Sequence, residues 1–148
     1  MKIKLDKGVK SYEYGITVDA KMPTRAHATD AGLDLYSREN VTLYPGESYV
    51  FDTGVHIAFD AGTYGKIESK SGLNVYYDIV SCGGVVDEGY TGSIRVKLYN
   101  LGHDFYIINI GDKIAQLVIM PYLTPAMEIV DELDETERGV NGFGSSGR

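Results

Sequence analysis

Short apolar runs separated by turn-forming residues recur along nearly the whole chain. Val, Ile, Tyr and Phe dominate these runs, and Gly, Pro, Asn and Asp occupy most of the positions between them. This pattern predicts an all-β domain built as a sandwich, a barrel or a jelly roll. The predicted strands are Lys2–Leu5, Leu33–Tyr36, Tyr49–Asp52, Val55–Phe59, Gly62–Glu68, Tyr77–Ser81, Ser93–Tyr99, Tyr106–Ile110 and Ala115–Tyr122.

Three segments depart from the strand pattern. Ser71–Tyr77 predicts one or two turns of helix, with Ser69 or Ser71 as the N-terminal cap. Glu128–Glu137 contains six carboxylates in ten residues, which is typical of a linker, and Arg138–Arg148 is rich in Gly and Ser, which predicts a flexible tail. We therefore divide the chain into a β domain (1–127), an acidic linker (128–137) and a flexible C-terminal segment (138–148).

Composition and charge narrow the class of protein. A length of 148 residues favours one domain, and a net charge of −7 argues against a general nucleic-acid binder, although a small anionic ligand remains compatible. Cys82 is the single cysteine, so no internal disulfide can form. The charged start and the shortness of the apolar runs predict no signal peptide and no membrane span, hence a soluble intracellular protein, cytoplasmic or in a host cell.

Two polar segments in the first half of the chain could bind a ligand. In the first, Asp30 and Asp34 flank a glycine at a strand entrance, where a carboxylate could hold a hydrated Mg²⁺; a simple Asx-type turn would show the same residues and is favoured by this segment alone. The second, Glu68–Leu73, combines Lys70 with serine hydroxyls before the predicted helix. It suits a phosphate, and equally an ordinary helix cap.

A third segment, Ser81–Gly92, is the most informative. Its two adjacent glycines allow a backbone to approach a flat ligand closely, and Asp87 is placed to act as a general base that activates water. Asp87 and Tyr90 could frame one pocket if the chain turns between them, which Glu88-Gly89 permits. A β-hairpin with an exposed Asp-Glu-Gly turn fits the segment equally well.

Two further segments lie near the C-terminus. Gln116 is a long amide inside the apolar run that follows Gly111, so it faces solvent or addresses a ligand, and strand alternation slightly favours solvent. In the tail, arginine suits a phosphate, Phe143 could stack on a base, and the paired hydroxyls of Ser145 and Ser146 could contact oxygens. A disordered chain end explains the tail composition as well.

The order and spacing of these five segments resemble the trimeric deoxyuridine triphosphatases (dUTP pyrophosphatases). The matching motifs are DAGLDLY at Asp30–Tyr36, SKSGL at Ser69–Leu73, GVVDEGYTG at Gly84–Gly92, GDKIAQL at Gly111–Leu117 and RGVNGFGSSG at Arg138–Gly147. This resemblance implies a jelly-roll subunit in a homotrimer whose active sites are shared between three chains. It also implies hydrolysis of dUTP to dUMP and pyrophosphate with Mg²⁺, which limits uracil incorporation into DNA and supplies dUMP for thymidylate synthesis.

The resemblance also implies a role for each motif. Asp87 would activate the water that attacks the α-phosphorus, Tyr90 would pack on the deoxyribose, and Gly84 with its neighbours would bind uracil through backbone groups. Asp34 would hold a water of the Mg²⁺. The residues that bind phosphates would be Lys70, Ser71, Gly72 and Gln116. The tail would act as a lid, in which Arg138 contacts the γ-phosphate and Phe143 covers uracil. Ser145 and Ser146 would contact the terminal phosphates.

Two departures from the family pattern stand out. Lys70 occupies a position that is usually arginine, so the forked guanidinium is missing there. Ser81 stands where many relatives carry an asparagine in the uracil pocket, so a shorter side chain, with or without a water, serves that edge.

Two alternative functions are a dCTP deaminase or bifunctional deaminase of the same fold, and a regulatory or binding protein that has kept the fold. The presence of all five motifs favours the hydrolase.

Overall fold

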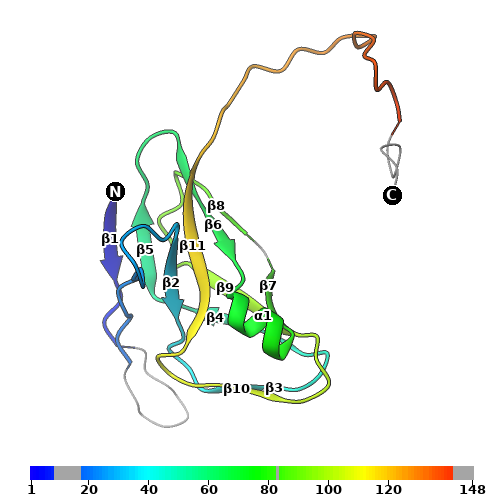
Figure 1. Ribbon diagram of the computed structural model, residues 1–148. Coiled ribbons are helices and arrows are strands. Elements are labelled where there is room, and N and C mark those ends of the chain that lie inside the picture. Colours follow the sequence, from blue (N-terminus) through cyan, green and yellow to red (C-terminus); the bar gives the residue numbers. More distant parts are fainter. Residues whose placement is uncertain (9–17, 83, 142–148) are drawn as a thin grey trace.

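The computed structural model describes residues 1–8, 18–82 and 84–141, and consists mainly of antiparallel strands (Figure 1). The all-β class with one short helix, predicted from the residue pattern, is confirmed for the described residues. The elements are β1 (Lys2–Leu5), β2 (Gly32–Tyr36), β3 (Val41–Leu43), β4 (Ser48–Asp52), β5 (Val55–Ala58), β6 (Thr63–Glu68), α1 (Ser71–Tyr77), β7 (Ile79–Cys82), β8 (Val85–Val86), β9 (Arg95–Asn100), β10 (Tyr106–Ile108) and β11 (Lys113–Pro121).

The longest strand, β11, organises the sheet that carries most of the polar motifs. It lies between β2 and β6, and β8 extends this sheet on the far side of β6. A second sheet has the order β4-β9-β7, and two strand pairs, β1-β5 and β10-β3, complete the fold. Because β11 pairs on both edges, Gln116 lies opposite Asp34 on β2 and opposite Glu68 on β6.

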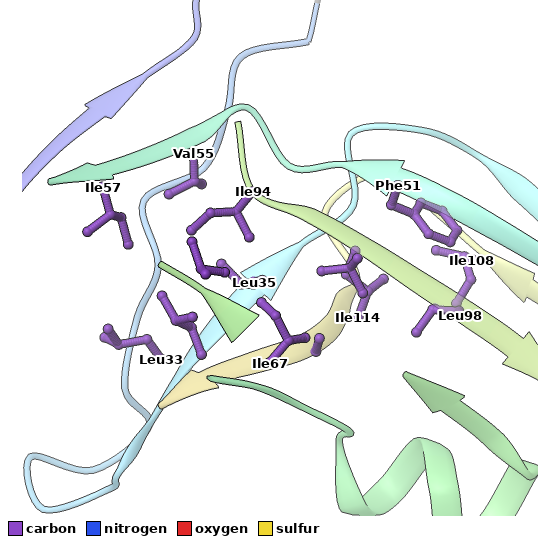
Figure 2. Packing of buried hydrophobic residues seen from close by; sticks show 14 of the residues in the cluster. Leu33, Leu35, Phe51, Val55, Ile57, Ile67, Ile94, Leu98, Ile108 and Ile114 are labelled. Carbon is purple, nitrogen blue, oxygen red and sulfur yellow. The ribbon is translucent and has the colours of Figure 1, made fainter. Parts of the chain in front are cut away.

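One hydrophobic core joins these sheets. Figure 2 shows Leu35 of β2, Ile67 of β6, Ile114 of β11 and Leu98 of β9 among the side chains that fill the space between the strands. Leu35 and Ile114 are fully buried, as is Leu117 further along β11. Side chains alternate between the two faces of a strand, so the neighbours of these apolar residues lie on the opposite face. Core packing therefore also fixes the face of the sheet on which the polar motif residues lie.

The helix α1 covers the predicted range, but its cap differs from the prediction. Lys70 occupies the N-cap position, and no side chain caps the helix there. The Ser69 hydroxyl instead accepts a hydrogen bond from the Ser81 backbone N–H (N···O 2.8 Å) and lies 3.1 Å from the Ser81 hydroxyl. Ser69 is thus used to join the end of β6 to β7, which leaves the helix start uncapped.

Several strand boundaries were also wrong. β3 and β8 have only three and two residues and were not predicted, because runs so short carry almost no periodic signal. Tyr77 belongs to α1, and β7 begins at Ile79 after Asp78 takes a left-handed conformation (φ 54°) that ends the helix. β10 stops at Ile108, since Asn109 begins a turn in which its carbonyl accepts from the Asp112 backbone N–H.

Beyond β11 the chain leaves the body of the molecule as an extended arm (Figure 1). Large apolar side chains of this arm are almost fully accessible, including Leu123, Met127 and Ile129, the last at 100% of its reference area. The proposed division between domain and linker at residues 127 and 128 falls inside this arm. Among the described residues, α1 is far too short to cross a membrane, and no longer apolar helix occurs.

Candidate functional site

A polar cavity of about 410 Å³ opens where β2 and β11 meet the end of β6. Its walls combine two ammonium groups, two carboxylates and one amide with small apolar side chains. The lining residues are Ala26, Asp30, Ala31, Gly32, Asp34, Lys70, Lys113, Gln116 and Val118. Residues from three of the five predicted motifs therefore lie together, as expected for a site that binds a charged ligand.

Asp34 is the electrostatic centre of this cavity. Its side chain is only 7% exposed, and Lys70 Nζ lies 2.6 Å from Oδ1 while Lys113 Nζ lies 2.7 Å from Oδ2. Burial raises the pKa of the Asp34 carboxyl, but the hydrogen bonds and charges of Lys113 and Lys70 outweigh burial, so the pKa lies below its ordinary value. The carboxylate is therefore ionised at neutral pH and shared by two cations.

Gln116 is half-buried and lines the cavity, which opens to solvent, so the solvent side and a ligand-binding position are the same place. Its Nε2 donates to the Ser69 carbonyl (3.0 Å), which leaves the amide oxygen directed towards Gly32. A Cβ built on Gly32 would stand 2.2 Å from Gln116 Oε1, so glycine is required for this side chain to fold against β2. The pairing of Gln116 with both neighbouring strands holds the amide beside Asp34.

Asp30 behaves as the turn interpretation anticipated. Its Oδ2 accepts from the His27 backbone N–H (2.9 Å) and lies 3.3 Å from His27 Nδ1. The hydrogen bond from the His27 backbone lowers the pKa of the Asp30 carboxyl. Asp30 therefore shapes the loop before β2 at the cavity rim.

Asp87 and Tyr90 lie together, but in another part of the molecule. Both line a hollow of about 220 Å³ with Val85, Ser93 and Ile94. The chain turns between them as Glu88-Gly89 permitted, and the Tyr90 backbone N–H donates to the Asp87 carbonyl (3.0 Å). Asp87 itself is exposed.

Hydrogen bonds from neighbouring elements hold this turn, which we call the Asp87 turn (residues 87–93). Glu88 Oε2 accepts from the Gly62 backbone N–H (2.8 Å) and from the Tyr122 hydroxyl (2.7 Å). The Tyr90 hydroxyl donates to the Ser93 carbonyl (3.0 Å). The Ser93 hydroxyl donates in turn to Asp52 of β4, which fixes the end of the turn.

The other predicted residues lie in the short helix, in or next to the strands beside it and in the arm, apart from three that the structure does not describe. Ser71 and Gly72 begin α1 directly after Lys70, and a Cβ on Gly72 would meet no atom within 4 Å. Ser81 is bonded to Ser69, and the Gly84 carbonyl accepts from the Ile67 backbone N–H (2.8 Å). Arg138 lies in the arm, where its Nε donates to the Asn141 carbonyl (2.9 Å). Phe143, Ser145 and Ser146 lie outside the described residues.

Lys113 is the cavity residue that sequence reasoning missed. It directly follows the Gly111-Asp112 turn, two positions before the predicted strand Ala115–Tyr122, and the sequence pattern assigns it no role. The consecutive apolar residues Ile114 and Ala115, which break strand alternation, were the available signal that Lys113 could share a face with Gln116.

The described residues also limit how a metal could bind. They contain no group of three or more His, Cys, Asp or Glu side chains that could enclose an ion. Asp34 offers one carboxylate, already bonded to two lysines. This donor set suits an Mg²⁺ that keeps its waters and takes most of its ligands from a bound polyphosphate.

Fold and site together define an all-β protein with a charged pocket whose two lysines and one amide suit a phosphorylated ligand. The chain belongs to the dUTPase family, whose model matches residues 18–147. A deoxyuridine 5'-triphosphate nucleotidohydrolase of Clostridium novyi (strain NT) is 45% identical over 130 residues, which cover 86% of this chain and 92% of the relative.

Solved structures of dUTPases are also similar to the structure of this chain. A variant of the Staphylococcus bacteriophage 80alpha dUTPase with dUpNHpp superposes with a TM-score of 0.84 at 31% identity and covers 99% of both chains. A variant dUTPase from phage phi11 of S. aureus, described with a structural Mg(II) ion, has a TM-score of 0.75 at 30% identity and covers 91% of this chain and 100% of its own.

Proposed function

We propose that this protein hydrolyses dUTP to dUMP and pyrophosphate, in sites that each combine the phosphate cavity of one chain with the Asp87 turn of another. The observation that carries the proposal is the pair of lysines on Asp34 beside Gln116, in a chain of the dUTPase family. Two cations, one amide and an ionised carboxylate are the groups needed to hold a metal-chelated triphosphate.

Strand register supports the shared site. Val86, next to Asp87, pairs with Gly65 in the first half of β6, whereas Lys70 lies two positions beyond the last residue of β6, Glu68. The five steps along the chain from Gly65 to Lys70 span about 16 Å at the rise of an extended chain. This separation of Asp87 from the cavity of its own chain supports a site in which a second chain supplies Asp87.

The exposed arm supports the same assembly. Its large apolar side chains are mostly accessible in the described part of this chain. Apolar surface of this kind is normally covered by another protein. A homotrimer satisfies both requirements, because each arm can cross to a neighbour and carry its tail to that neighbour's site. In this arrangement Arg138 contacts the γ-phosphate, Phe143 covers uracil, and Ser145 and Ser146 contact the terminal phosphates.

In the cavity, Lys70, Ser71, Gly72 and Gln116 bind the phosphates. Ser71 donates to the oxygen that leaves with pyrophosphate, and the open space beside Gly72 lets a phosphate approach the backbone. Asp34 holds a water of the Mg²⁺, which neutralises phosphate charge and orients the triphosphate for in-line attack. The pKa of Asp34 below its ordinary value keeps this carboxylate charged for that role.

On the opposite side, Asp87 accepts a proton from water while the water oxygen bonds to the α-phosphorus. The bond from the α-phosphorus to its bridging oxygen breaks, and pyrophosphate leaves with the electron pair. Tyr90, fixed by its bond to Ser93, packs on the deoxyribose and excludes a 2′-hydroxyl. Backbone groups at Gly84, with Ser81 beside them, bind the uracil edge.

Mixed oligomers test both the activity and the sharing of sites. Asp87→Asn and Lys70→Ala should each abolish pyrophosphate release from dUTP with Mg²⁺. When the two variants are co-expressed and random trimers form, about one quarter of sites should take Asp87 and Lys70 from intact chains, so activity should return to about one quarter of wild type.

A matched mixture provides the control. Lys70 and Gln116 belong to one cavity, so every site in a co-expressed mixture of Lys70→Ala and Gln116→Ala carries one of the two changes. This mixture should therefore be no more active than the average of the two variants measured separately. Absence of activity in the first mixture would contradict the shared site, whereas absence of pyrophosphate release by the wild-type protein would contradict the hydrolase itself.

A further inference from the structure

A β-bulge determines which side chains of β11 enter the phosphate cavity. Lys113 pairs with Tyr36 and Ala115 with Leu35, so Ile114 is an extra residue in β11. In a regular strand, Lys113 and Gln116 would point to opposite faces, because they are three positions apart. The bulge buries Ile114 and Ala115 together and lets Lys113 and Gln116 line the same cavity.

Lys113 and Lys70 contact Asp34 in the same way. Each lysine bonds one oxygen of the carboxylate, Lys70 to Oδ1 and Lys113 to Oδ2. One carboxylate cannot balance two ammonium groups, so this trio carries one net positive charge, and the second carboxylate of the cavity, Asp30, lies at the rim, where its hydrogen bond is to the His27 backbone. The Lys70 and Lys113 side chains are 27% and 43% exposed, so either ammonium can move to a ligand without disturbing the core.

We propose that Lys113 is a second cationic phosphate-binding residue, held on Asp34 until the nucleotide arrives and then transferred to oxygens of the triphosphate. The inference rests on the proposed function of the cavity. A metal-chelated triphosphate offers more negative charge than one carboxylate, so both ammonium groups gain charge-assisted hydrogen bonds when they leave Asp34. Lys113 thereby compensates for the absence of a guanidinium fork at Lys70, whose ammonium lacks the planar pair of donors that binds two phosphate oxygens side by side.

Calorimetric titration of the full chain with dUMP, dUDP and dUpNHpp, each with Mg²⁺, tests this role. Lys113→Gln should weaken binding of dUpNHpp about tenfold, as expected for one lost charge-assisted contact, and weaken dUDP less and dUMP least. Lys113→Arg should restore most of the affinity. Lys4→Gln is the matched control, because Lys4 is also paired with an aspartate (3.8 Å) but lies on β1 away from the cavity.

The pattern across the three ligands separates binding from a structural effect. The slope of log Kd against log salt concentration for dUpNHpp should also become shallower in Lys113→Gln, since one cation fewer contacts phosphate. Unchanged affinity for all three ligands, or an equal loss for all three accompanied by a lower Tm, would overturn the role of Lys113. Failure of the wild-type protein to bind dUpNHpp would overturn the proposed function together with it.

Discussion

The phosphate cavity and the Asp87 turn are held in place by different kinds of interaction. In the cavity, β2 presents Asp34, β11 presents Lys113, and Lys70 follows the end of β6. The sheet beneath them is part of the core, with Leu117 fully buried. The Asp87 turn rises from the two-residue strand β8 and is fixed by hydrogen bonds of Glu88 and Ser93 to other elements. One region is held by charge on a rigid sheet, the other by hydrogen bonds on an exposed loop.

The difference matches what each region is proposed to do. A binding pocket for phosphates needs fixed charges before the ligand arrives, and a sheet interior supplies them with little loss of entropy on binding. A turn that activates water must meet a substrate held by another chain, so it needs exposure together with a defined conformation. Variants of each region should therefore fail in different ways.

The largest expected effect is that of Asp87→Asn. The amide keeps the shape of the side chain but cannot accept the proton from water, so turnover should fall by about 10² to 10⁴-fold, while dUpNHpp still binds the cavity. Pyrophosphate release and calorimetry measure the two quantities. Asp104→Asn, an exposed aspartate in the loop before β10, is the control; turnover retained in Asp87→Asn would place the base elsewhere.

Deletion of residues 138–148 should have the next largest effect. Because Arg138 contacts only the arm in the described chain, Tm should not change, but turnover should fall about 100-fold through loss of the groups that close the site. Steady-state kinetics and thermal unfolding measure the two effects. A full kcat in the truncated protein would remove the tail from the mechanism.

The local residue pattern predicted most of the fold. β1 was predicted at its observed bounds, and α1 was correct in extent, because each depends on signals within the segment itself. β3 and β8 were missed, since strands of two or three residues are formed by pairing with distant partners rather than by periodicity.

The site was predictable only in part, for the same reason. The motif resemblance identified Asp34, Lys70 and Gln116, and the structure brings these three together. Lys113 escaped because the bulge reverses strand alternation, and bulges are decided by strand pairing in three dimensions. The distance between Lys70 and Asp87 in one chain likewise follows from the register of β6, which the sequence alone does not contain.

The contribution of Asp52 to the free energy of unfolding should depend on pH, which gives a smaller test of how the end of the Asp87 turn is held. Burial raises the pKa of Asp52, but hydrogen bonds from Ser93 and Gly54 and the charges of Arg38 and Arg95 outweigh burial and hold it below its ordinary value. A depressed pKa means that this stabilisation is present above the ordinary aspartate range and is lost as the pH falls through the folded-state pKa.

Asp52→Asn should therefore lower the free energy of unfolding by about 1 to 2 kcal/mol at pH 7, and the difference from wild type should shrink below about pH 4. Urea unfolding across pH 3 to 7 measures this difference. A gap that stays constant down to pH 3 would mean that the Asp52 charge does not stabilise the end of the turn.

The smallest expected effect concerns Glu88, which positions the Asp87 turn without contacting substrate. In Glu88→Ala, the Gly62 N–H and the Tyr122 hydroxyl lose their hydrogen-bond acceptor. The value of kcat should fall about threefold, because a looser turn misplaces Asp87. The value of KM should change little, because the phosphate cavity stays intact. Glu39→Ala is the matched control, since Glu39 also accepts from a tyrosine hydroxyl, that of Tyr49, and raises its pKa to about 12. An equal fall in kcat for both variants would show that loss of a Glu–Tyr pair has only a general effect, whereas a fall confined to Glu88→Ala ties the hydrogen bonds of the turn to the rate of the chemical step.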